Sequence, residues 1–346
     1  MKITRIILFV LFFIIPLDDI FSGQFLNAYK KGMRALNQKN YIKAIDYFSD
    51  ALKFTENEKF LSVIYNLRGT VYSKLKEYDK ALRDFEKAIQ LDPKYEEAYN
   101  NCGIVYCELG RFEKAIENYT RAIELWRKYP EALYNRGLAY LEEGEYEKAV
   151  GDFTEVINLR PRHASTYSMR ALVYSKIGSK EKAFDDFSKA LEINPEYSDT
   201  YFNRGLSYSD YGEYEKAVEA FTKSIKLNPA NADAYYNRGV IYLERKENKK
   251  AIIDFSQAIS LNPSFKGAYF NRGVCYQRIK EEKKAIEDFS EVIKLNPRDA
   301  EAFYERGISY FHKWENEKSI LDLKKAVDLG HSRARKFLKK NFNIDY

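Results

Sequence analysis

Small, aromatic and polar positions recur at fixed intervals along most of this chain. A glycine is followed twelve residues later by an alanine, then by an aromatic residue and another small residue, as in Gly239, Ala251, Phe255 and Ala258. Because the last three are spaced by four and three residues, they share one face of an α-helix. A tyrosine three residues after the glycine, here Tyr242, marks another helix, which precedes this one in the sequence and faces it. The pattern therefore predicts closely packed helical hairpins.

The pattern has a period of 34 residues, kept by three kinds of marker. Prolines lie in register at Pro93, Pro161, Pro195, Pro229, Pro263 and Pro297. Glycines lie in register at Gly69, Gly103, Gly137, Gly205, Gly239, Gly273 and Gly307, with Ala171 in the missing place. A second set, expected at the turns between helices, comprises Gly110, Gly144, Gly178 and Gly212. Such a period predicts stacked modules that bury their apolar faces against their neighbours.

The residues Tyr235, Gly239, Tyr242, Ala251, Phe255, Ala258 and Pro263 resemble the tetratricopeptide repeat pattern, and comparable matches cover residues 25–333. The resemblance implies an all-α fold, a right-handed α-solenoid of about nine repeats with a C-terminal capping helix. The expected units are 25–61 (weak), 62–95, 96–129, 130–163, 164–197, 198–231, 232–265, 266–299 and 300–333 (degenerate), followed by a cap at 334–346. Atypical terminal repeats are expected, because one side of each lacks a neighbour.

The first residues are typical of an export signal. Lys2 and Arg5 precede the apolar run 6–15, which as a helix would span about 15 Å, half of a bilayer core. We therefore expect residues 1–23 to be a cleaved signal peptide and the protein to be exported, to a periplasm, cell envelope or medium. Two alternatives stay open: an uncleaved anchor formed by residues 6–17, and a buried helix.

The composition gives no indication of catalysis. The chain has three cysteines, Cys102, Cys107 and Cys275. An odd number cannot form a closed disulfide framework, so we interpret them as small buried residues. The three histidines have no partners at the spacing of a metal or nucleophile motif: His163, His312 and His331. The repeats leave no room for a separate catalytic domain. We expect no cofactor, no metal and no enzymatic activity.

The charge distribution argues against nucleic acid. The net charge is +6, but residues 332–346 alone hold five bases against Asp345. The positions that the resemblance places on the concave face are mainly acidic, with Glu97, Glu131, Asp199, Asp233 and Glu301 at the second position of their repeats, and Glu108, Glu142, Asp210 and Glu244 against Lys74, Lys176 and Arg278 at the thirteenth. Such a surface repels phosphates and attracts basic segments.

Two side-chain types recur in register on the two helices of each repeat. Arginine precedes the marker position at Arg68, Arg136, Arg170, Arg204, Arg238, Arg272 and Arg306. Aspartate follows sixteen residues later at Asp84, Asp152, Asp186, Asp254, Asp288 and Asp322, whereas Ala220 follows Arg204. Where arginine is replaced by Cys102, aspartate is replaced by Asn118. We predict a charge pair that joins the two helices of a repeat; the alternative is a row of ligand-binding arginines.

Two further rows are candidate ligand contacts. The sixth position of the repeats carries Asn101, Asn135, Asn203, Asn237 and Asn271, and the fifth carries Tyr134, Phe202, Tyr236, Phe270 and Tyr304. The asparagine row is similar to the ladder with which some family members grip a ligand's main chain, since an amide both donates and accepts. The rings are suited to anchoring apolar side chains. Equally, asparagine is common at this position of the repeat, and the rings could simply fill the groove.

The function that follows is a protein-interaction scaffold. We expect it to bind an extended or helical segment of another protein, with basic and apolar residues, along the concave face of repeats 4 to 9. The residues that some relatives use to hold a C-terminal carboxylate are absent here. The alternative function is a membrane-tethered assembly factor that keeps its N-terminal segment as an anchor. An enzyme and a nucleic-acid binder are less favoured.

Overall fold

The computed structural model describes residues 23–346, and these form two compact units. The first unit ends at Ile177 and the second runs from Gly178 to Tyr346. The expected signal segment lies outside the described residues, apart from Gly23.

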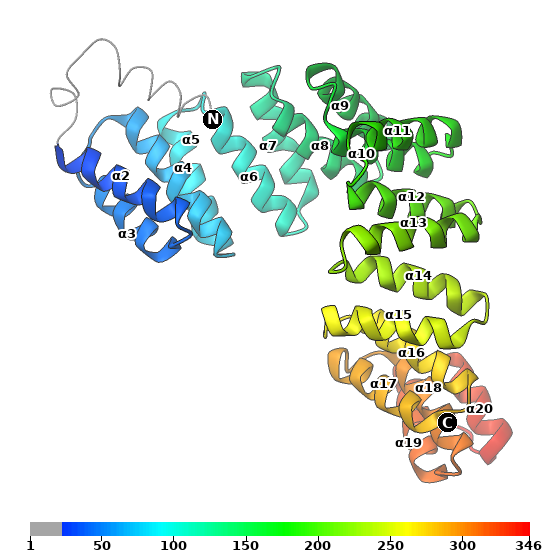
Figure 1. The fold of residues 1–346 in the computed structure, drawn as a ribbon. Coiled ribbons are helices and arrows are strands. Elements are labelled where there is room, and N and C mark those ends of the chain that lie inside the picture. The colour runs from blue at the N-terminus through cyan, green and yellow to red at the C-terminus, as the bar shows by residue number, and fades with distance from the viewer. Residues whose placement is uncertain (1–22) are drawn as a thin grey trace. The chain divides into compact units, whose positions relative to one another are not determined.

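The described part of the first unit consists of helices, each packed against the next one along the chain (Figure 1). They are α2 (Gly23–Asn37), α3 (Tyr41–Ala51), α4 (Glu58–Lys74), α5 (Tyr78–Leu91), α6 (Glu96–Glu108), α7 (Phe112–Leu125), α8 (Pro130–Glu142), α9 (Tyr146–Leu159) and α10 (Ala164–Lys176). The tightest pairs are α2 with α3, α4 with α5, α6 with α7 and α8 with α9.

Within the second unit, consecutive helices also pack against each other (Figure 1). Its helices are α11 (Lys180–Ile193), α12 (Ser198–Asp210), α13 (Tyr214–Leu227), α14 (Ala232–Glu244), α15 (Asn248–Leu261), α16 (Lys266–Arg278), α17 (Glu282–Leu295), α18 (Ala300–His312), α19 (Asn316–Asp328) and α20 (Ser332–Phe342). No strand occurs among residues 23–346. The predicted all-helical solenoid of hairpins is therefore confirmed.

Most hairpins close where a marker glycine meets the aromatic ring of the second helix, whereas Gly307 meets Leu323. A Cβ added at Gly137 would lie 2.8 Å from Cε1 of Phe153, and one at Gly239 would lie 2.8 Å from the same atom of Phe255. Both rings are fully buried. The missing side chain lets the two backbones approach, and the ring fills the gap beside them, as protein interiors require.

The turn inside each hairpin uses a residue with a left-handed backbone. Gly144 and Gly212 have φ values of 75° and 71°, which glycine adopts without steric cost. The corresponding turn residues Lys246, Lys280 and Trp314 have φ values of 61°, 63° and 64° although they carry a Cβ. The sequence pattern located the glycine turns but not these strained ones.

The two ends of the array depart from the regular repeat. Helix α4 begins at Glu58, ahead of residue 62, because the side chain of Asn57 accepts from the backbone N–H groups of Lys59 and Phe60 and so caps the helix earlier. At the other end α20 packs on α19 and buries Ala334 and Leu338 completely.

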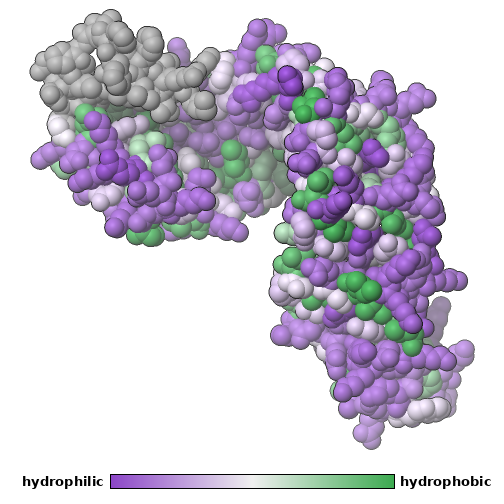
Figure 2. All heavy atoms as spheres, viewed as in Figure 1, coloured by the Kyte–Doolittle hydropathy of each residue, from purple (hydrophilic) through white to green (hydrophobic). Residues whose placement is uncertain are grey.

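The visible surface of both units is mostly hydrophilic, with small apolar patches between hydrophilic residues (Figure 2). The most exposed large apolar residues, Trp314, Leu321 and Ile253, are 84%, 70% and 68% exposed. No helix within residues 23–346 is long and apolar enough to cross a membrane.

Candidate functional site

The predicted contact residues lie on the first helices of their hairpins, some in each unit. In the first unit Asn101 lies on α6, and Tyr134 and Asn135 lie on α8. In the second unit they occupy α12 (Phe202, Asn203), α14 (Tyr236, Asn237), α16 (Phe270, Asn271) and α18 (Tyr304). The first helices α12, α14, α16 and α18 contact each other in sequence, so the second-unit residues follow one face.

Several of the asparagines already use an N–H group to join consecutive repeats. Nδ2 of Asn101 donates to Oδ1 of Asn66 over 2.9 Å, and Nδ2 of Asn135 donates to Oδ1 of Asn100 over 3.2 Å. In the second unit Nδ2 of Asn271 donates to the phenol oxygen of Tyr236 over 3.2 Å. In each case the sixth position of one repeat donates to the fifth position of the preceding repeat. We call this contact the amide link.

Asn237 differs from these three, and Asn203 is buried. Asn237 donates over 2.8 Å to the backbone oxygen of Asp233, one turn earlier in its own helix. Asn203 is only 8% exposed. An intact asparagine row with both amide groups free for a ligand is therefore not present in either unit.

The rings of the fifth position are half-buried and held by neighbours. Phe202 and Phe270 pack on the buried phenylalanines of their own second helices, with ring centroids 5.8 and 5.5 Å apart. Tyr236 packs in the same way on Phe255 at 5.8 Å. This fixes the orientation of each ring and leaves part of it accessible.

Two of the predicted rings are contacted by side chains at the start of a following helix, α20 or α10. Tyr304 is stacked on His331 at 4.3 Å, with the guanidinium of Arg333 5.0 Å from its centroid. Tyr134 makes a hydrogen bond of 2.7 Å with Ser165 and an edge contact of 5.8 Å with His163. These two rings present less apolar surface than Phe202, Tyr236 and Phe270.

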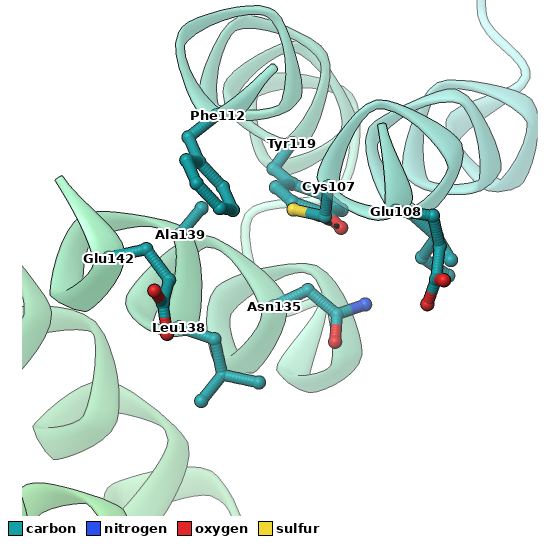
Figure 3. A pocket seen from close by; sticks show the side chains of 9 residues that line it. Cys107, Glu108, Phe112, Tyr119, Asn135, Leu138, Ala139 and Glu142 are labelled. Atoms are coloured by element: carbon teal, nitrogen blue, oxygen red, sulfur yellow. Dashed lines mark hydrogen bonds between the residues drawn. The ribbon is translucent and has the colours of Figure 1, made fainter. Parts of the chain in front are cut away.

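A pocket of about 230 Å³ opens in the first unit between α6, α7 and α8 (Figure 3). It is lined by Ile104, Cys107, Glu108, Phe112, Tyr119, Asn135, Leu138, Ala139 and Glu142. Its walls are largely apolar, and its charged side chains are the two glutamates. The pocket contains no basic residue. It therefore suits an apolar side chain that is accompanied by a positive charge.

Cys107 and Tyr119 form the inner part of the pocket (Figure 3). The Tyr119 hydroxyl donates to the Cys107 sulfur over 3.6 Å, and burial raises the pKa of this thiol. A thiol with a raised pKa stays protonated at neutral pH and is a poor nucleophile. At the rim, Glu108 accepts a hydrogen bond of 3.3 Å from the Tyr78 hydroxyl. The pocket has the character of a binding site.

The predicted arginine–aspartate pairs are present in both units. Arg136 holds Asp152 with Nε and Nη2, each bond 2.8 Å long, and Arg238 holds Asp254 in the same way. The same two-pronged pair occurs at Arg68 with Asp84, Arg272 with Asp288 and Arg306 with Asp322. Because their donors already face a carboxylate, these arginines form no ligand-binding row.

Each of these arginines also reaches a third helix. Nη1 of Arg136 donates to the hydroxyl of Thr120 over 3.0 Å, and Nη1 of Arg238 donates to Thr222 over 2.9 Å. The hydroxyl belongs to the second helix of the preceding repeat. One guanidinium therefore fixes both the hairpin and its neighbour.

The histidines are engaged in local contacts. Nδ1 of His312 lies 3.1 Å from Oε1 of Glu282, and Nε2 of His331 lies 2.9 Å from Oε2 of Glu301. His163 lies 2.6 Å from the Thr166 hydroxyl, and burial lowers its pKa. The described residues contain no group of three or more His, Cys, Asp or Glu placed to hold a metal ion.

Sequence reasoning missed the pocket and both inter-repeat contacts. The hydroxyl partners could have been found, because serine or threonine recurs at one position of the second helix, as at Thr120, Thr222 and Ser256. The pocket has a weaker signal: the short side chain of Cys107 stands where two later repeats have Leu141 and Leu243, but two others have Ser175 and Ser209.

Comparison with known families accounts for most of the chain. A model described as tetratricopeptide repeat matches residues 62–95, 130–163, 232–265 and 267–299. A second tetratricopeptide repeat model matches residues 85–117 and 187–219, and a third matches residues 164–197. A model described as TPR repeat matches residues 103–144 and 208–245. Together these matches cover well over half of the chain.

Individual relatives are more distant. Small glutamine-rich tetratricopeptide repeat-containing protein 2 of Saccharomyces cerevisiae is 37% identical over 65 residues, which is 19% of this chain and 18% of the relative. A tetratricopeptide repeat protein from Parabacteroides merdae has a similar fold, with a TM-score of 0.57 and 21% identity over 72% of this chain and 98% of its own. The APC/C hetero-tetramer Cut9-Hcn1 has a TM-score of 0.54 and 16% identity, over 90% of this chain and 75% of its own.

Proposed function

The chain belongs to the tetratricopeptide repeat family, and from this premise we propose that it is a non-enzymatic scaffold for another protein. The segment it binds is extended and carries basic and apolar side chains. The family and the helical fold support the general role of a protein-interaction scaffold. The pocket in the first unit supports the proposed chemistry of the segment.

The observation that carries this proposal is the combination of apolar walls and acidic rim at the pocket. Ile104 is 37% exposed, so apolar surface is open to a ligand there. Glu142 is exposed and forms no hydrogen bond or ion pair within the described residues. A leucine-sized side chain in the pocket would bury apolar area, and a neighbouring lysine or arginine would pair with the carboxylates.

The amide links determine which hydrogen bonds the asparagines can make with the main chain of such a segment. Asn101 and Asn135 each donate an amide N–H group to an asparagine of the preceding repeat. Their Oδ1 atoms accept no hydrogen bond from the described residues, so they can accept from a ligand N–H group. A ligand main chain with free N–H groups, which an extended segment has and a helix interior lacks, fits this arrangement.

The second unit offers a related surface on α14. Tyr236 is partly accessible there, and the helix carries an exposed carboxylate near each end, at Asp233 and Glu244. Neither carboxylate has a side-chain partner among residues 23–346. We propose that the same kind of segment binds along Phe202, Tyr236 and Phe270.

The test is calorimetric titration of the purified protein with an extended probe. The probe is an eight-residue peptide of alternating lysine and leucine with blocked ends, and a peptide of alternating glutamate and leucine is its control. Replacing both rim glutamates (Glu108→Gln with Glu142→Gln) should lower affinity about fivefold, because each exposed charge contact contributes up to about 1 kcal/mol.

A matched variant separates this effect from net charge. Glu117→Gln with Glu155→Gln removes two exposed carboxylates from the second helices α7 and α9, in the same two repeats. Its affinity should equal that of the unmodified protein. The proposal fails if the lysine–leucine probe does not bind, or if both double variants weaken binding equally.

We also propose that the protein is exported by its N-terminal segment, which lies outside the described residues. Lys2, Arg5 and the apolar run 6–15 support this. Fractionation followed by N-terminal sequencing tests it: a mature end near Gln24 supports export, whereas a retained Met1 in the membrane fraction supports the tethered assembly factor.

A further inference from the structure

Arg204 on α12 lacks the carboxylate that holds the equivalent arginine in other repeats. Sixteen residues after it stands Ala220, which is buried with 3% exposure, where Arg238 and Arg272 find Asp254 and Asp288. The Nε–H group of Arg204 is buried and makes no hydrogen bond. A buried donor without a partner costs free energy that a suitable acceptor would recover.

The other neighbours of Arg204 do not compensate. The hydroxyl equivalent to Thr222 is that of Ser188, which donates over 2.7 Å to the backbone oxygen of Phe184 and makes no bond with Arg204. The guanidinium lies over Tyr208 at 5.5 Å. Arg238 by comparison lies over two rings as well as holding its aspartate. Within residues 23–346, the Arg204 guanidinium thus has this ring contact but neither the carboxylate nor the hydroxyl partner of Arg238.

A second irregular repeat lacks the aspartate but has no unpaired arginine. In the hairpin of α6 and α7 both members differ, because Cys102 replaces the arginine and Asn118 replaces the aspartate. Cys102 is buried and uncharged, and Asn118 donates to the backbone oxygen of Lys114. Of the repeats that keep this arginine, the one with Arg204 lacks the aspartate sixteen residues later.

We propose that Arg204 and Ala220 form a binding site for a carboxylate. The alanine methyl supplies no acceptor where the aspartate carboxylate holds Arg238, and the planar fork of arginine donors matches a carboxylate in that place. The carboxylate comes from a small organic acid or from an aspartate or glutamate of a partner protein.

This site is separate from the proposed groove. Arg204 follows Phe202 by two residues, which places it about 200° around the helix axis. It faces α13 and its neighbours, as the pairing of Arg238 with Asp254 shows for the equivalent residues of α14 and α15. A ligand here would occupy a different surface from the segment proposed above, so the two proposals fail independently.

The test is an NMR titration that follows the arginine Nε–Hε signals of the full chain with sodium formate, against sodium chloride at equal ionic strength. Arg204→Lys assigns the signal. A saturable formate-specific shift of Arg204, with no such shift of the paired Arg238, is the expected result. A shift that stays linear, or that is equal for both arginines, overturns the proposal.

Two variants sharpen the result. Ala220→Asp supplies the missing carboxylate and should abolish the formate response of Arg204, while Asp254→Ala should create the same response at Arg238. Should Ala220→Asp fail to fold, the comparison within the unmodified protein and the Asp254→Ala variant still decide. An unchanged Arg204 response in a folded Ala220→Asp protein contradicts the assignment.

A second titration distinguishes the two sources. A blocked Gly-Asp-Gly peptide presents a carboxylate on a main chain. Saturable shifts with both formate and the peptide support a partner side chain as ligand. Shifts with formate alone support a small acid, and absence of both overturns the site.

Discussion

Asn271 donates a hydrogen bond of 3.2 Å to the phenol oxygen of Tyr236, 35 residues earlier in the chain. The same phenol oxygen approaches Gly267, where an added Cβ would lie only 3.1 Å away. Tyr236 therefore spans from α14 to α16 and is held there. Two residues that the sequence suggested as separate ligand contacts form one internal contact between repeats.

The amide link predicts coupling between these two residues. Asn271→Ala should lower the free energy of unfolding by about 1 kcal/mol, the usual contribution of one hydrogen bond. A urea-denaturation cycle with Tyr236→Phe should show that the two changes are not additive.

Asn237→Ala is the matched control for this cycle. It removes an asparagine from the same repeat position, but one that bonds to its own helix backbone. Its effect should be within about 0.5 kcal/mol, as for other surface substitutions. Full additivity of Asn271→Ala and Tyr236→Phe would show that the amide link contributes nothing.

The fold was predictable because small and large residues alternate with a fixed period. Gly239, Ala251 and Phe255 carry the whole argument for one hairpin, since close approach and space filling depend on side-chain size alone. Features that depend on capping were less visible. The early start of α4 depends on the Asn57 side chain, outside the periodic pattern.

The contact between marker glycine and ring predicts different outcomes for two glycines of one hairpin. Gly137→Ala should lower the free energy of unfolding by about 1–3 kcal/mol, because its Cβ would overlap the buried Phe153 ring. Gly151→Ala meets nothing within 4 Å and should stabilise α9 by about 0.5–1 kcal/mol. Thermal denaturation of both variants checks this. Equal effects would contradict the packing account.

The arginine–aspartate pair predicts a large cost when one member is lost. Asp254→Ala should lower the free energy of unfolding by about 2 kcal/mol, because Arg238 would keep buried donors without an acceptor. Adding Arg238→Met should recover part of the loss. The double-mutant cycle measures this, and zero coupling would remove the pair as a determinant of hairpin register.

The strained turns predict a gain from glycine. Lys246→Gly should raise the free energy of unfolding by about 1 kcal/mol, since φ at this turn is 61° and only glycine adopts it without strain. Lys249→Gly, within α15, should instead lower it by about 1 kcal/mol. Urea denaturation distinguishes these, and a loss at both positions would show that turn strain is unimportant.

Glu305 predicts a pH dependence in the terminal repeat. It takes the sixth position, where neighbouring repeats have Asn237 and Asn271, and burial together with the Glu301 carboxylate raises its pKa. The folded state then binds the proton more tightly than the unfolded state. Stability is lost as the pH rises from the ordinary glutamate pKa through the raised one.

Replacing this group with an uncharged one should remove that loss. Glu305→Gln should raise the melting temperature at pH 7 and leave it unchanged at a pH below both pKa values. Glu287→Gln, at an exposed position of α17, serves as the control and should have little effect at either pH. Equal shifts at both pH values would contradict this explanation.

The candidate site was only partly predictable, because a repeat position says which face a residue shares and not what it bonds to. The sequence places Asn101 and Asn66 in neighbouring repeats, but the bond between them depends on how far two helices are apart. The pocket likewise depends on the absence of bulk around Cys107 in three dimensions. Residue type and period alone do not determine such spaces.

The most direct test of the account is a crystal structure of the protein with the lysine–leucine peptide bound. The account predicts a leucine side chain between Ile104, Phe112 and Leu138, a lysine beside Glu108 or Glu142, and unbroken amide links at Asn101 and Asn135. A peptide whose main chain replaces Asn66 and Asn100 as partners of these amides, with the pocket empty, would contradict it.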